Sequence, residues 1–180
     1  MRKLYLILGK SGSGKTTVSD FISKHNIDIE HYSMGNEFRK IAEKDSEIGK
    51  YVFSGKRVPD KIAKDVLSQV INKFSKDIII VDGFPRDHKQ TALLDLLLKK
   101  NNVNLNKVFE IILDDNIAQN RVLNRGRGSD DNIKVFNSRL KDYNMQMEHI
   151  RKYYSDILIS INGNDKVENI AKNIGKIINE

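Results

Sequence analysis

The sequence of 180 residues predicts an α/β fold of the doubly wound class, with three layers and a central five-stranded parallel sheet. Short, continuous apolar runs alternate with stretches of helical periodicity, which is the pattern of parallel strands that are covered on both faces. The first apolar run leads directly into a glycine-rich turn and then a helix. The length is that of one domain, and a chain of this size can bury a core without cross-links.

Strands and helices can be placed in order along the chain. The strands are expected at residues 4–8, 30–33, 78–81, 107–113 and 156–161. The helices are expected at residues 15–24, 36–47, 60–74, 88–100, 116–124, 132–154 and 167–178. The asparagine-rich residues 101–106 are expected to form a turn. The helix at 60–74 has the clearest periodicity, given by Ile62, Val66, Leu67, Val70 and Ile71.

The composition argues against several kinds of site. Cysteine is absent, so there is no disulfide framework and no cysteine ligand or nucleophile. No apolar run approaches the roughly 20 residues of a membrane span, and the apolar N-terminus leads into the glycine-rich turn, so we expect a cytoplasmic protein. The net charge of +7 favours acidic partners. Because no basic stripe is interleaved with aromatic residues, we expect phosphorylated small molecules rather than nucleic acid. The histidines, His25, His31, His88 and His149, show no metal-site spacing.

Residues 9–16, Gly-Lys-Ser-Gly-Ser-Gly-Lys-Thr, fit the phosphate-loop (P-loop) pattern. The glycines allow backbone N–H groups to point at a phosphate, and the following helix N-terminus adds a partial positive charge. We expect Lys15 to reach the β- and γ-phosphates and the Thr16 hydroxyl to hold Mg²⁺. The motif predicts a P-loop nucleotide-binding protein and leaves open transfer, hydrolysis or switching.

The apolar strand at 78–81 is followed by a carboxylate, Asp82. In P-loop proteins the metal-orienting aspartate stands at such a strand end. We expect Asp82 to hold Mg²⁺, partly through water, although a strand-ending aspartate also commonly caps a turn. The residues that follow, Gly83-Phe84-Pro85-Arg86, favour the metal-site interpretation.

The segment 82–86, Asp-Gly-Phe-Pro-Arg, taken with the phosphate loop, resembles the adenylate kinase family of nucleoside monophosphate kinases. The resemblance continues in order along nearly the whole chain. Residues 33–39 resemble the segment that opens the monophosphate-binding helix, and residues 55–60 resemble the lining of the base pocket. Arg121 and Arg125 match the start of the family's lid, and Arg127 with residues 130–132 resembles its end. The resemblance implies transfer of the γ-phosphoryl group of ATP to a nucleoside monophosphate, with Mg²⁺.

The resemblance also implies roles for individual residues. The expected catalytic residues are Lys15, Arg86, Arg125, Arg127 and Arg139. The expected ATP-binding residues are Gly12, Ser13, Gly14, Lys15, Thr16, Thr17 and Arg121. The expected monophosphate-binding residues are Met34, Arg39, Val58, Gly83, Arg86 and Gln90, and the expected Mg²⁺ ligands are Thr16 and Asp82. No general base is expected, because the acceptor is already an anion. Asp130 and Asp131 are expected to pair with arginines and to position the lid.

The use of arginine supports these roles independently. Arginine is much rarer than lysine in this chain, yet six of its nine arginines fall on the motif positions: Arg39, Arg86, Arg121, Arg125, Arg127 and Arg139. The planar guanidinium group binds phosphate oxygens in pairs, which the lysine ammonium group does not.

Two residues, Gln90 and Met34, bear on which base the acceptor nucleotide carries. Gln90 matches the family position that reads the base, where adenylate kinases carry Gln and pyrimidine-directed relatives tend to carry Asn. An amide offers a donor and an acceptor to adenine. Met34 stands where adenylate kinases often carry Thr, and it offers only apolar contact. We expect AMP as the acceptor, with a UMP/CMP-type kinase and a P-loop ATPase or regulatory nucleotide-binding module as alternatives.

The resemblance implies one monomeric nucleoside monophosphate kinase domain over residues 1–180. Its core would comprise residues 1–32, 61–124 and 133–180. A small helical monophosphate-binding insertion is expected at about 33–60. A very short lid is expected at about 125–132, where Gly126 and Gly128 indicate a flexible turn.

Overall fold

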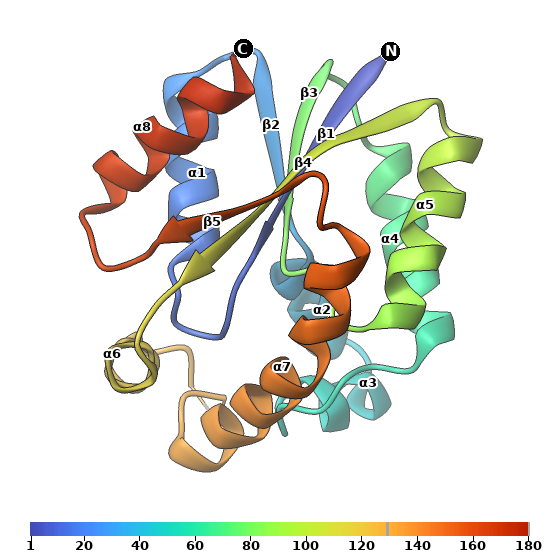
Figure 1. Cartoon of the computed structure of the whole chain (residues 1–180). Helices are drawn as coiled ribbons and strands as arrows, with labels where there is room; N and C mark the ends of the chain where they lie inside the picture. The colour runs from blue at the N-terminus through green and yellow to red at the C-terminus, as the bar shows by residue number, and fades with distance from the viewer. Residues whose placement is uncertain (129, 180) are drawn as a thin grey trace.

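Five parallel strands form the central sheet of the computed structural model, which describes residues 1–128 and 130–179 (Figure 1). They are β1 (Arg2–Leu8), β2 (Ile29–Ser33), β3 (Ile78–Asp82), β4 (Val103–Ile112) and β5 (Leu158–Asn162). Their spatial order is β2-β3-β1-β4-β5, and each neighbouring pair is parallel. The predicted fold class is therefore confirmed. From β1 and β3 the chain leaves toward opposite edges of the sheet, and ligands of doubly wound sheets bind at such a point.

Helices cover both faces of the sheet (Figure 1). α1 (Lys15–His25) and α8 (Val167–Ile178) lie on one face, and α4 (Asp60–Asn72) and α5 (His88–Lys100) lie on the other. Successive residues of β1 point to opposite faces. Accordingly Tyr5 and Ile7 belong to the apolar cluster under α1 and α8, whereas Leu4 and Leu6 belong to the larger cluster under α4 and α5.

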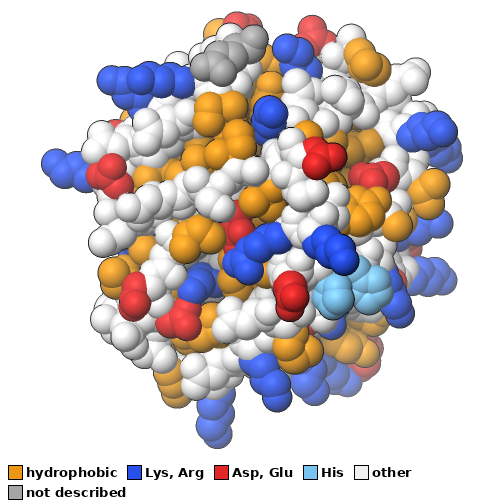
Figure 2. Space-filling view, in the orientation of Figure 1, with side chains coloured by type: hydrophobic (Ala, Val, Ile, Leu, Met, Phe, Trp, Pro, Cys, Tyr) orange, Lys and Arg blue, Asp and Glu red, His pale blue; other side chains and the backbone are white. Residues whose placement is uncertain are grey.

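Four further helices gather near the carboxyl ends of the strands, at the end of the molecule away from both termini (Figure 1). They are α2 (Met34–Ala42), α3 (Ser46–Val52), α6 (Asp115–Leu123) and α7 (Ile133–Tyr153). No helix in the described part of the chain is long and apolar enough to span a membrane. On the face shown in Figure 2, Lys and Arg side chains are dispersed among acidic and apolar ones.

The predicted helix at 36–47 is wrong, because the structure has two helices there. α2 ends at Ala42, and α3 begins at Ser46. The carboxylate of Asp45 accepts the backbone N–H groups of Glu47 and Ile48 at 2.9 and 3.2 Å. A side chain that caps a helix N-terminus in this way starts a new helix, and the periodicity of the segment did not reveal it.

The predicted turn at 101–106 is correct only for its first two residues. From Val103 onward the chain belongs to β4, where Val103 pairs with Arg2 and Leu105 with Leu4. Val103 is buried and Asn104 is exposed, so the segment alternates as a strand does. The asparagines concealed this pattern. The other predicted helix and strand boundaries lie within two residues of those in the structure.

Two leucines on α5 test this packing. Leu94 is 1 % exposed and Leu96 is 69 % exposed. Leu94→Ala should lower the free energy of unfolding by about 2–5 kcal/mol, because it leaves a cavity in the core. Leu96→Ala, the matched control, should change it by less than about 0.5 kcal/mol. Urea unfolding followed by circular dichroism measures both, and equal effects would contradict the packing described here.

Candidate active site

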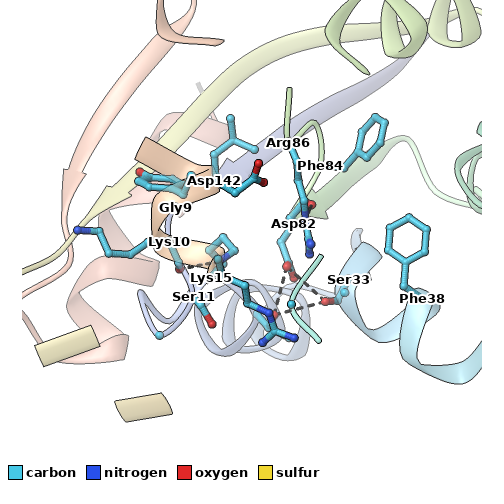
Figure 3. A pocket seen from close by; sticks show the side chains of 18 of the residues that line it. Gly9, Lys10, Ser11, Lys15, Ser33, Phe38, Asp82, Phe84, Arg86 and Asp142 are labelled. Carbon is cyan, nitrogen blue, oxygen red and sulfur yellow. Dashed lines mark hydrogen bonds between the residues drawn. The ribbon is translucent and has the colours of Figure 1, made fainter. Parts of the chain in front are cut away.

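A cavity of about 320 Å³ lies at the carboxyl ends of β1 and β3 (Figure 3). Most of the predicted site residues line it. They are Gly12, Gly14, Lys15, Thr16, Thr17, Arg39, Val58, Asp82, Gly83, Arg86, Gln90, Arg121, Arg125, Arg127 and Arg139. Two predicted residues lie elsewhere. Ser13 is buried within the loop, and Met34 is fully buried in the apolar core, so neither side chain is among those that line the cavity.

The phosphate loop connects the end of β1 at Leu8 to the start of α1 at Lys15. Its glycines at 12 and 14 have φ angles of +84° and +91°, which side-chain-bearing residues rarely adopt. Gly14 is also the N-cap of α1, and no side chain caps the first N–H groups of that helix. An uncapped helix N-terminus is an anion-binding position.

Lys15 projects from this loop, and its Nζ donates to the carbonyl oxygen of Lys10 at 2.9 Å. Burial lowers the pKa of Lys15 to about 8. The Asp82 carboxylate opposes this shift, and the charges of Arg86, Arg125 and Arg139 add to it. The cavity therefore holds an ammonium group that a phosphate would stabilise.

Oxygen atoms from three elements meet beside Lys15. The hydroxyls of Thr16 on α1 and Ser33 at the end of β2 donate to Asp82 Oδ1 at 3.2 and 3.3 Å. Asp82, at the end of β3, is 2 % exposed. The register of β2 against β3 places Ser33 opposite Asp82. Hydroxyl and carboxylate oxygens are the ligands that Mg²⁺ prefers, so this group fits the ion.

His31 was not foreseen as part of this group. It lies on β2, where its Nε2 is 2.7 Å from Asp82 Oδ2 and its Nδ1 is 2.9 Å from Asp20 Oδ1. Burial alone would lower the pKa of His31, but the hydrogen bonds and charges of Asp82 and Asp20 outweigh burial and raise it. His31 could have been found from its place in the sequence, because it stands two residues before Ser33 and therefore on the same face of the strand.

Asp130 holds three of the arginines together. Its side chain is buried, and its Oδ2 lies 2.8 Å from Arg139 Nη2, 3.8 Å from Arg125 Nη2 and 3.9 Å from Arg39 Nη1. Burial, followed by the charge of Arg127, lowers the pKa of Arg39 to about 10. The cluster thus carries more positive charge than this one carboxylate neutralises.

Asp131 adds a second acidic contact to this group of arginines. Its Oδ1 accepts Arg125 Nε at 2.5 Å, and its Oδ2 accepts the backbone N–H of Arg127 at 2.6 Å. The expectation that Asp130 and Asp131 pair with arginines is confirmed. Ser129, which falls within the predicted lid, lies outside the described residues.

Arg86 and Arg39 meet over the start of α2. A Cβ placed on Gly35 would lie 3.6 Å from Arg39 Nη2 and 3.9 Å from Arg86 Nη2. Arg86 is held by its own loop, since its Nε donates to the Gly83 carbonyl at 3.0 Å and its backbone N–H donates to Gln90 Oε1 at 2.8 Å. Two guanidinium groups this close could bind one anion between them.

An ion-pair group beside Arg86 was also missed. Arg57 contacts Asp87, the N-cap of α5, and its Nε lies 3.0 Å from Asp142 Oδ1 on α7. Burial raises the pKa of Asp142, while the charges of Arg57 and Arg86 act against that rise. Asp142 follows Arg139 by three residues and so shares its helix face. This spacing was the only feature of the sequence that could have placed Asp142 at the site.

Apolar side chains complete the lining. Figure 3 shows Phe38 and Phe84 on one side of the cavity, with Lys10 on the opposite side. Val52, Val58, Met147 and Ile150 also line it. A flat, apolar wall next to anion-binding groups suits a nucleotide, which has an aromatic base and phosphates.

A P-loop, a carboxylate at the end of the neighbouring strand and arginines around one cavity define a P-loop nucleoside monophosphate kinase. The comparisons with known proteins agree. The family model described as "Adenylate kinase" matches residues 7–158. The chain is 39 % identical to the adenylate kinase of Nautilia profundicola, over 100 % of this chain and 98 % of that protein. It is 40 % identical to that of Campylobacter hominis, over 99 % and 96 % respectively. The chain belongs to the adenylate kinase family.

The lowered pKa of Lys15 predicts how nucleotide binding depends on pH. Above pH 8 the free protein loses the ammonium charge of Lys15, so phosphate binding weakens as the pH rises. Mg²⁺-free ATP should bind about tenfold more weakly at pH 9 than at pH 7, because about one-tenth of a group with pKa about 8 is protonated at pH 9. Calorimetric titration measures this. Lys15→Met should bind weakly at both pH values, and an equal pH effect in that variant would assign the titration to another group.

Proposed function

We propose that this protein transfers the γ-phosphoryl group of ATP to AMP and releases two ADP. The observation that carries the proposal is that two groups of anion-binding donors line one cavity. One is the phosphate loop with Lys15, and the other is the guanidinium pair of Arg39 and Arg86 over Gly35. A simple ATPase needs only the first. The names of the related proteins support the same reaction.

In this proposal each nucleotide has its own end of the cavity. ATP binds to the phosphate loop, with Arg121 on its base side, and the monophosphate binds between Arg86, Arg39 and Gln90. Because Met34 lies in the core, contact with the acceptor base falls to Gln90, Val58 and Phe38. Gln90 is 4 % exposed and its Oε1 accepts the backbone N–H of Arg86 at 2.8 Å, so its side-chain amide is held in one orientation.

The reaction needs charge stabilisation more than proton transfer. An oxygen of the AMP phosphate attacks the γ-phosphorus, the bond to the β–γ bridging oxygen breaks, and ADP leaves as an anion. Arg125, Arg127 and Arg139 neutralise the charge on the transferring group, and Lys15 stabilises the leaving side. The attacking oxygen is already anionic, so no side chain acts as a base.

Magnesium fits the oxygen group beside Lys15. Thr16, Ser33 and Asp82 would hold it, directly or through water, and when bound it would offset negative charge on the ATP phosphates. His31, held between Asp82 and Asp20, would keep the Asp82 carboxylate in its orientation.

The proposal also assigns parts of the chain. Residues of about 33–60 act as the monophosphate-binding part, and residues of about 125–132 as a short lid that carries Arg125 and Arg127. The remainder is the core. The fold of a single chain brings the phosphate loop and the Arg39–Arg86 pair to one cavity, and we propose that the monomer is active.

The acceptor is tested with a panel of monophosphates. In a coupled assay of ADP release, AMP should exceed UMP, CMP, GMP and dTMP in kcat/KM by at least about tenfold, or roughly 1.4 kcal/mol. The reason is that the Gln90 amide, whose Oε1 is oriented by the Arg86 N–H, offers adenine its Nε2–H donors and the second lone pair of Oε1. A lead of UMP or CMP over AMP by the same factor would replace the proposal with a pyrimidine nucleotide kinase.

Arg86 separates the kinase from a simple ATPase. Arg86→Ala should lower kcat/KM for AMP by about 100-fold, since it removes two charge-assisted hydrogen bonds of about 1.5 kcal/mol each. Calorimetric binding of ATP should change by less than about twofold, or roughly 0.5 kcal/mol. The reason is that the proposal places Arg86 at the monophosphate end of the cavity. Arg2→Ala, at the opposite end of β1, is the control. Unchanged acceptor-dependent turnover in Arg86→Ala would contradict the two-site proposal.

A further inference from the structure

Helix α6 runs along the phosphate loop and meets it at three places. Asp115 pairs with Lys10, the carbonyl oxygen of Ala118 would lie 2.2 Å from a Cβ on Gly12, and Arg121 Nη1 would lie 3.9 Å from a Cβ on Gly14. The three contacting residues of α6 are three positions apart and therefore lie on one face of the helix. Their partners in the loop are every second residue. The helix and the loop are therefore in register over this length.

Apolar packing fixes α6 only weakly. Its two buried residues are Ala118 and Val122. They belong to a small cluster with Leu113 and Phe136, separate from the two large clusters that cover the sheet. Ile117 of α6 also packs against this cluster but is only partly buried, so less apolar area holds α6 than holds the helices over the sheet. Polar contacts must therefore contribute more to holding α6 in position.

The polar contact nearest the start of α6 is the ion pair of Lys10 with Asp115. The Lys10 side chain is 12 % exposed and that of Asp115 is 50 % exposed, so the pair is partly shielded from water. Figure 3 shows the Lys10 side chain directed away from Lys15 and Arg86. The same residue accepts Lys15 Nζ at 2.9 Å and the Ser13 N–H at 3.2 Å through its carbonyl oxygen. Lys10 thus connects the phosphate loop, Lys15 and α6.

We propose that the Lys10–Asp115 ion pair is a positioning contact that sets the register of α6 against the phosphate loop. It thereby places Arg121, and Arg125 just beyond the end of α6, on the ATP side of the cavity. Neither Lys10 nor Asp115 touches the reacting atoms. The inference rests on the proposed function, because it concerns the ATP half of the same site.

The test uses Lys10→Met, Asp115→Asn and the double variant. Each single change should raise KM for ATP, and Kd for ATP in calorimetry, by about fivefold, which converts to roughly 1 kcal/mol. KM for AMP should change by less than about twofold, because Arg39 lies on α2, Gln90 on α5 and Arg86 between β3 and α5, and none of them is carried by α6. The double variant should be no weaker than the weaker single variant, because both changes remove the same contact. Lys10→Arg should restore most of the ATP affinity.

The control is Lys73→Met, which breaks the ion pair of Lys73, an exposed side chain at the end of α4, with Glu37 on α2. It should leave KM for ATP unchanged. Thermal unfolding of every variant is measured alongside. A loss that affects ATP and AMP equally and follows the melting temperature would mean a general structural role and overturn the proposal.

Opposite effects of the two changes would also overturn it. If Lys10→Met weakened ATP binding and Asp115→Asn strengthened it, Lys10 would itself bind phosphate and Asp115 would compete for it. Should the neutral variants fail to fold, Asp115→Glu keeps the charge but changes the length of the pair, so it should weaken ATP binding more than AMP binding, and equal effects on both would overturn the proposal. A protein that binds ATP as expected but never uses AMP would contradict the proposed function and leave this inference standing.

Discussion

Repulsion between cations is the constraint on which the site depends. Lys15 and the arginines at 39, 86, 125 and 139 face one cavity, and their mutual charge is part of why the pKa of Lys15 and that of Arg39 are lowered. Buried carboxylates keep the group together. The Asp130 carboxylate lies within ion-pair distance of Arg39, Arg125 and Arg139, and Asp82 partly offsets the lowering of the pKa of Lys15. The acids neutralise only part of this charge, and the remainder makes the cavity selective for polyanions.

The sheet brings these groups together from distant parts of the chain. β1 ends in the phosphate loop, β3 ends in Asp82, and β2 ends in Ser33, and all three ends lie at one edge because the strands are parallel. Arg39 comes from α2 and Arg139 from α7, which close the cavity from other sides. No single segment could bind two nucleotides. The alignment of strand ends creates the cavity, and the helices at this edge add arginines to its lining.

Sequence reasoning succeeded where the signal is local and failed where it depends on a partner far along the chain. The phosphate loop and residues 82–86 are short motifs with fixed geometry, and the structure gathers both at the cavity. Arg57 shows the other case, since its partners Asp87 and Asp142 lie 30 and 85 residues away. Met34 was assigned to the cavity by its place in a motif, yet its side chain turns into the core. Direction of a side chain is set by packing, which the sequence pattern did not reveal.

Gly12 has a consequence for how this protein can change over generations. Its φ of +84° disfavours a side chain, and the carbonyl oxygen of Ala118 occupies the space that a Cβ would need. These are two independent obstacles, so relief of one does not admit even alanine. A shift of α6 to make room would carry Arg121 away from Gly14. Random mutagenesis under selection for activity should therefore recover no variant at Gly12, so descendants of this protein must keep glycine at this position.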